Sequence, residues 1–125
     1  GISGPGRFGQ KGEHAIDIIS ENVQVLSGLA KDIINAVINR NRPLIRACYD
    51  SALRRNPQLS GKVVIYFDID RNGRVIRVGV KESTLGDSGL EHCIAERIRG
   101  MEFPKPEAPV TTEVTAYPFY LKPAN

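Results

Sequence analysis

The chain has 125 residues, of which 41% are hydrophobic and 25% are charged, and its formal net charge is +3. These values are typical of one ordinary globular domain. The mild charge argues against a nucleic-acid-binding surface. No run approaches the roughly 20 apolar residues that a membrane-spanning helix requires, and the first residues lack the apolar run of a signal peptide. We therefore expect any membrane anchor to lie in a parent protein, outside this sequence.

The first residues are rich in glycine. Five glycines and one proline fall within residues 1–12, and such a stretch buries too little surface to order itself. We expect residues 1–22 to form a flexible Gly-rich linker and residues 23–125 to form the domain. The sequence also allows a short strand at residues 23–26.

Apolar residues then recur at three- and four-residue steps from residue 27 to residue 55, which predicts a long amphipathic helix. Ser27 is the expected N-cap. Pro43 interrupts the pattern, and the residue before a proline avoids the helical region. We therefore expect either a kink or two short helices that meet near residues 41–42.

Residues 61–69 alternate apolar and polar side chains and predict a strand, with Val63, Ile65, Phe67 and Ile69 on one face. The sequence Asp-Arg-Asn-Gly at residues 70–73 indicates a hairpin turn. Residues 74–81 are expected to return as the second strand.

Ser88 and Glu91 fit a capping box at the start of a second helix. A third strand is expected at residues 111–121, where Pro118 indicates an edge position or a bulge because it cannot donate to a ladder. These elements predict an α+β fold: a three-stranded, mostly antiparallel sheet with two helices packed on one face.

Candidate catalytic groups are few. His14 and His92 are the two imidazoles, and His92 cannot readily pair with its helical neighbour Cys93 because adjacent side chains point about 100° apart. Cysteine and histidine are not spaced as metal ligands. We expect no enzymatic activity, no metal and no cofactor.

Cys48 and Cys93 are the two cysteines of the chain, and each falls in a predicted helix. They could be small buried hydrophobic residues. They could also form a disulfide that ties the helices together in an oxidising compartment. The residues alone leave both readings open.

The last strand is the candidate binding site. An extended peptide can pair with the unpaired backbone of an edge strand. The alternative is an edge that is covered by the N-terminal segment or by a second copy of the domain. The predicted docking residues are Val110, Thr111, Thr112, Glu113, Val114, Thr115, Ala116 and Tyr117.

Several segments carry a resemblance to a known family. Residues 59–69 (LSGKVVIYFDI) and 72–75 (NGRV) resemble the hairpin of TonB C-terminal domains, and the likeness continues through residues 82–85 and 103–106. A narrower likeness is to the variant found in adventurous-gliding proteins of myxobacteria (the AgmX/PglI type). It is carried by residues 46–49, 55–57, 83–86, 91–94 and 117–119.

The resemblance implies a periplasmic, TonB-like domain of an inner-membrane-anchored protein. Its last strand, here residues 110–117, would receive an extended segment of an outer-membrane protein, and an inner-membrane motor complex would act on it through the parent protein. The role would be gliding motility or outer-membrane transport. The gliding variant pairs cysteines at the positions of Cys48 and Cys93. Relatives tend to carry Trp where this chain has Met101, a difference that we assign to core packing.

The alternative function is a static structural adaptor, which binds the cell wall or forms a homodimer without transmitting force. Neither reading involves nucleic acid.

Overall fold

The computed structural model describes residues 15–17 and 22–123. They form an α+β fold in which every strand pairing is antiparallel. In chain order the elements are β1 (Ala15–Asp17), β2 (Gln24–Leu26), α2 (Lys31–Arg40), α3 (Arg42–Arg55), β3 (Gly61–Ile69), β4 (Val75–Ser83), α4 (Ser88–Arg99) and β5 (Thr112–Lys122).

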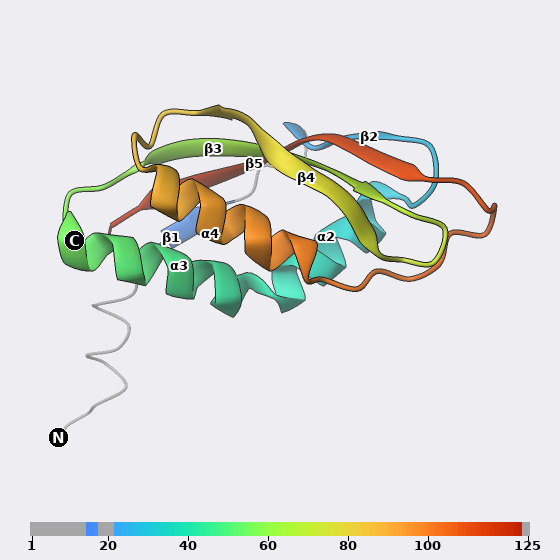
Figure 1. Cartoon of the computed structure of the whole chain (residues 1–125), viewed down its shortest axis with the longest axis horizontal. Coiled ribbons are helices and arrows are strands. Elements are labelled where there is room, and N and C mark those ends of the chain that lie inside the picture. Colours follow the sequence, from blue (N-terminus) through green and yellow to red (C-terminus); the bar gives the residue numbers. More distant parts are fainter. Residues whose placement is uncertain (1–14, 18–21, 124–125) are drawn as a thin grey trace, which may run out of the picture.

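The sheet lies over the helices as a second layer (Figure 1). Its strand order is β1-β5-β3-β4, and β2 also pairs with β5. The strands β1 and β2 therefore follow one another along one side of β5, and β4 forms the opposite edge of the sheet. The expected three strands and two helices are thus a partial description. The first helical stretch is divided, and two short strands are added to the sheet ahead of it.

One of these short strands falls within the predicted linker. The backbone of Ala15–Asp17 is in register with residues 120–122 of β5, and the side chain of Ile16 is buried. The prediction of a linker over residues 1–22 is therefore wrong at β1. Residues 1–14 and 18–21 lie outside the described part of the chain. The short strand expected at residues 23–26 is confirmed as β2.

The central hairpin follows the prediction closely. The four apolar residues on one face of β3 (Val63, Ile65, Phe67 and Ile69) are fully buried. In the turn, the carboxylate of Asp70 accepts hydrogen bonds of 2.9 Å from the amides of Asn72 and Arg74, and Gly73 has a φ of 88°. A side chain disfavours such a positive φ, which is why glycine stands at this position.

The two helices before the hairpin meet as Pro43 predicts. Helix α2 ends at Arg40, and α3 begins at Arg42 with the proline in its first turn, a position where the missing N–H costs nothing.

The expected helix start at Ser27 is wrong, since α2 begins at Lys31. The segment before α2 is instead held against the start of β5. The hydroxyl of Ser27 donates to the carbonyl of Thr111, and the amide of Leu29 donates to the hydroxyl of Thr112.

Helix α4 also begins with a different cap. The residue at its N-cap is Asp87, whose carboxylate accepts a hydrogen bond of 2.9 Å from the amide of Leu90. The capping box assigned to Ser88 and Glu91 is therefore wrong by one residue. Hydrogen bonding from Leu90, followed by the nearby Arg55 guanidinium, lowers the pKa of Asp87.

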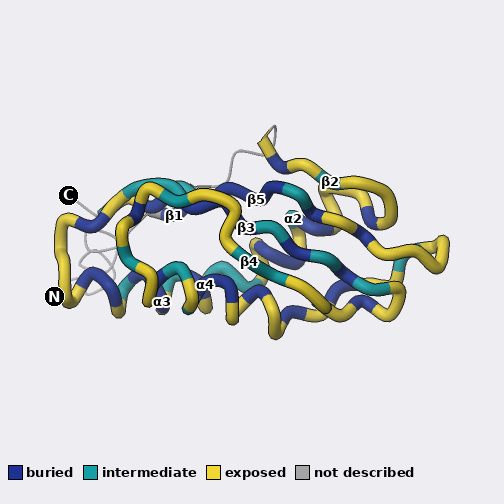
Figure 2. The backbone as a smooth tube through the Cα atoms, turned by 45° about the horizontal axis from the view of Figure 1, so that its top comes forward, coloured by how far each residue is buried: buried dark blue, intermediate teal, exposed yellow. Residues whose placement is uncertain are grey.

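Large aromatic side chains fill the space between the layers, and Figure 2 shows the buried residues gathered where helices and sheet face each other. Tyr49, Phe67, Tyr117 and Phe119 are each fully buried. The hydroxyl of Tyr49 donates to the carbonyl of Leu59 at 2.6 Å, and burial raises the pKa of Tyr49 to about 12. Met101 is also buried, as expected of a core residue.

A disulfide joins Cys48 of α3 to Cys93 of α4, with their Cα atoms 5.8 Å apart. This agrees with the disulfide reading of the two cysteines. The bridge lies within the helical layer and ties its two longest described helices together.

Candidate docking site on the sheet edges

Strand β5 carries the predicted docking residues, and it lies inside the sheet rather than at its edge. On one side it pairs with β3 along most of its length. On the other side, which we call the docking edge, Glu113, Val114 and Ala116 are in register with β2. Over this half of β5 the structure thus corresponds to the alternative in which the N-terminal segment covers the edge.

The structure places the predicted residues as follows. Val110 and Thr111 precede β5 and are exposed, and Glu113 is exposed within it. The remaining members of the set are buried or half-buried: Thr112, Val114, Thr115, Ala116 and Tyr117. Thr112 is fully buried, and its hydroxyl accepts a hydrogen bond from the amide of Leu29. Of these eight consecutive residues, β2 pairs with the backbone of Glu113, Val114 and Ala116 on the docking edge.

The other half of the docking edge is covered by β1. Ile16 is in register with Leu121, and both side chains are buried. Among the described pairs, β1 reaches Tyr120 of β5 and β2 reaches Ala116. Pro118 lies between these two positions. A proline in a sheet requires a position that is free of ladder donation, and this interval provides one on the docking edge.

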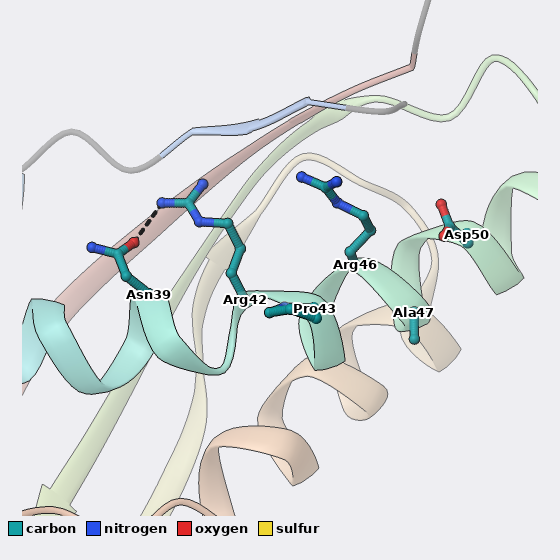
Figure 3. A pocket seen from close by; sticks show the side chains of 6 residues that line it. All are labelled: Asn39, Arg42, Pro43, Arg46, Ala47 and Asp50. Atoms are coloured by element: carbon teal, nitrogen blue, oxygen red, sulfur yellow. Dashed lines mark hydrogen bonds between the residues drawn. The ribbon is translucent and has the colours of Figure 1, made fainter. Parts of the chain in front are cut away.

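Arg42 contacts β1 from the helical layer. Its guanidinium donates to the backbone carbonyl of Ile16 and also to the Asn39 side chain, the latter at 2.6 Å. Figure 3 shows the Arg42 and Arg46 side chains extending from the helices to the same side. The pocket beside them has a volume of about 390 Å³ and is lined by Asn39, Arg42, Pro43, Arg46, Ala47 and Asp50.

Sequence reasoning missed both Ile16 and Arg42. A strand of three residues is too short for an alternating pattern to be recognised. The arginine falls in a run of basic residues on the first helical stretch, and such a run is typical of a solvated helix face. Residues 15–17 (AID) do not alternate between apolar and polar, so the sequence carried no strand signal there.

The segment around β2 is attached to the rest of the fold by several buried and hydrogen-bonded side chains. Val23 is fully buried and Leu29 is nearly so. The hydroxyl of Thr115 donates to the carbonyl of Gln24, in addition to the hydrogen bonds of Ser27 and Leu29 with the start of β5. The segment around β2 is therefore attached to β5 by side chains as well as by backbone.

Strand β4 forms the open edge of the sheet within the described residues. It pairs with β3 alone, apart from an isolated bridge just before it, between Arg74 and Glu102. Two apolar side chains on β4, Ile76 and Val80, are 56% and 36% exposed. An unpaired strand that shows apolar side chains can add another strand. The register of β4 with β3 shifts at Ile76, which has no partner in β3.

The face of the sheet away from the helices carries paired charges. Lys62 and Glu82 lie 2.9 Å apart, and so do Arg77 and Asp68. The hydrogen bond and charge of Glu82 raise the pKa of Lys62. Lys81 donates to the carbonyl of Thr115 at 3.2 Å. These pairs neutralise one another, so this face does not form a strong anion site.

No group of three or more histidine, cysteine, aspartate or glutamate side chains gathers in a metal-binding arrangement in the part of the chain that the structure describes. His14 lies outside that part. Within the same residues, no helix has the length and apolar character needed to cross a membrane.

Comparison with known proteins gives no match to a family model, to a curated protein or to a solved structure.

Proposed function

We propose that this chain is a strand-docking module, the C-terminal periplasmic domain of a TonB-like protein that transmits force to an outer-membrane partner. The observation that supports it best is the docking edge itself. Two separate extended segments, β1 and β2, already add to β5 as antiparallel strands. Main-chain hydrogen bonds of this kind give affinity to an added peptide, and alternate side chains give selectivity.

The disulfide between Cys48 and Cys93 supports the periplasmic address. Disulfides form and persist in the periplasm and are rare in the cytosol. The sequence resemblance to TonB C-terminal domains supports the rest of the proposal: anchoring of a parent protein in the inner membrane, a motor complex acting on it, and a role in gliding motility or outer-membrane transport.

Binding in this proposal needs no catalytic residue and no cofactor. The partner would be recognised through backbone groups and through the apolar side chains that its strand places against the core. The activity to be measured is therefore docking, not turnover.

In-cell photocrosslinking tests the proposal. A crosslinking amino acid is placed at Glu113 or Thr115, which lie on β5 and are at least partly accessible, and at Glu96 on the exposed side of α4 as a matched control. We expect the two β5 positions to capture an outer-membrane protein and Glu96 not to do so. Capture of the same protein at all three positions, or of no envelope protein at β5, would contradict docking there.

The open edge of β4 favours a second candidate, the static adaptor that works by dimerisation. Two copies could pair through their β4 edges and bury Ile76 and Val80. Analytical ultracentrifugation distinguishes this function: it predicts a dimer that Val80→Pro dissociates, because proline cannot donate across a new strand pair. A monomer at all accessible concentrations would contradict it.

A further inference from the structure

We infer that β1 is an exchangeable strand that occupies the place of the partner. The docked partner segment runs antiparallel to residues 120–122 of β5, places an aliphatic side chain where Ile16 lies, and offers a backbone carbonyl to Arg42. This inference rests on the proposed function and moves the docking site from the first half of β5 to its end.

The two N-terminal strands, β1 and β2, are attached to β5 unequally. The segment around β2 inserts Val23 and Leu29 into the core and makes three hydrogen bonds that involve side chains, two to β5 and one to Thr111 just before it. The described contacts of β1 are three backbone register pairs, the buried Ile16 side chain and the bond from Arg42. A strand with fewer anchors opens at a lower free energy, so β1 is the strand that a partner displaces.

The side chain of Ile16 defines what the partner must present. It is 3% exposed and lies opposite Leu121, which is 1% exposed. Burying a charged or strongly polar side chain there without a partner is costly. A segment with a branched aliphatic residue at this position fits the edge, and one with aspartate does not.

Arg42 contacts the strand through its backbone and therefore does not select for particular side chains. Its guanidinium donates to a backbone carbonyl, which every residue type has, and Asn39 holds it in position. The carbonyl lies at Ile16, so Arg42 fixes the register at the same residue whose side chain enters the core. One aliphatic residue in the correct register is therefore the minimal requirement for a partner.

The chain itself supplies the probe. A synthetic peptide with the sequence of residues 13–20 is titrated into two full-length proteins, the unmodified chain and Ile16→Asp, in which the covering strand is weakened. We expect the peptide to bind Ile16→Asp at least about tenfold more tightly, because in the unmodified chain the attached β1 occupies the edge most of the time. Amide resonances of Tyr120, Leu121 and Lys122 should shift, and those of Glu113 and Val114 should not.

Three controls accompany the titration. A peptide with aspartate at the Ile16 position should not bind. Arg42→Gln, added to Ile16→Asp, should weaken peptide binding several-fold, and Arg40→Gln, which changes an exposed arginine at the end of α2, should not. If Ile16→Asp proves to be unfolded, Ile16→Ala replaces it and should show the same order of affinities.

Two outcomes would overturn the inference: equal peptide affinity for both folded proteins, or shifts confined to β4. A further variant separates this failure from failure of the proposed function. In Ala15→Cys/Lys122→Cys a second disulfide locks β1 to β5 at opposed positions. With the crosslinking amino acid placed instead at the half-buried Tyr120, opposite β1, loss of in-cell capture on locking supports β1 exchange. Capture that persists with β1 locked leaves docking intact and shows that it does not use this half of the edge.

Discussion

Tyr66 of β3 lies over Gly79 of β4, the residue opposite it in the strand register. A Cβ atom added at Gly79 would collide with the Tyr66 ring and hydroxyl. The Arg77 guanidinium also contacts the Tyr66 ring. It lies 4.9 Å from the ring centroid, which is a cation–π contact. Glycine at this position thus allows an aromatic side chain to cover β4, the strand that forms the open edge.

This relationship predicts that Gly79→Ala destabilises the fold. Overpacking of this kind costs about 1–3 kcal/mol, measured as the free energy of unfolding in urea. The control is Gly89→Ala in α4, where the nearest atom is an ordinary contact at 3.4 Å, and it should not destabilise the fold; alanine favours a helix over glycine by up to about 1 kcal/mol. In a Tyr66→Ala background the cost of Gly79→Ala should largely vanish. A cost that stays the same there would show that Tyr66 is not its cause.

Removal of the disulfide should lower stability strongly. The bridged cysteines are 45 positions apart in the sequence, and the chain-entropy relation for a loop of this size gives roughly 4 kcal/mol. We expect Cys48→Ala/Cys93→Ala and the reduced natural chain to unfold at a similarly lower urea concentration. Reductant should not change the double variant, since these are the two cysteines of the chain. Equal stability of the oxidised and reduced chains would contradict the prediction.

The cap of α4 predicts a stability change that depends on pH. Asp87→Ala should cost about 1 kcal/mol at neutral pH. Because the pKa of Asp87 is lowered in the folded state, its contribution is fully present above the unfolded value of about 4 and is lost as the pH falls through the folded value. The difference between the two proteins should therefore shrink in acid.

The neighbouring serine provides the control for Asp87. Ser88 is the first residue of α4 and not its cap, so Ser88→Ala should change the free energy of unfolding by less than about 0.5 kcal/mol at any pH. A larger effect at Ser88 than at Asp87 would restore the capping box that the sequence suggested.

Buried tyrosines predict a loss of stability in alkali. An unfolded tyrosine ionises near pH 10, whereas burial raises the pKa of Tyr49 to about 12. Above pH 10 the unfolded chain releases a proton that the folded chain retains, so stability falls as the pH rises. Tyr49→Phe should reduce this fall without abolishing it, because burial also raises the pKa of Tyr117. Unfolding midpoints between pH 9 and pH 12 provide the measurement. An unchanged slope in Tyr49→Phe would refute the assignment.

The hairpin could be predicted from sequence because its signals are local. Alternation fixes β3 over nine residues, and the turn from Asp70 to Gly73 uses residue types that favour it. The break at Pro43 is equally local, since one ring excludes a continuous helix. The caps were harder. Asp87 and Ser88 are both good N-cap residues, and the choice between them depends on where the preceding loop reaches α4.

The sequence left open whether the N-terminal segment covers β5, because the covering depends on pairing between the two ends of the described chain. Ala15 and Lys122 are register partners across more than a hundred residues, and three residues carry no periodic pattern of their own. The candidate docking strand was therefore found, but its environment was not. Recognising that the edge is occupied, and by which side chain, required the strand register and the burial of Ile16.

The disulfide between α3 and α4 also closes a covalent ring within the chain. The ring closed by Cys48 and Cys93 contains β3 and β4, whereas β1, β2, α2 and β5 lie outside it. A protease cut at the Asp70–Gly73 turn would leave both fragments joined and would show one band on a gel until reductant is added. A cut ahead of β2 would release β1 at once. The strand that covers the end of the docking edge is thus a part of the described fold that no covalent ring retains once the chain is cut behind it.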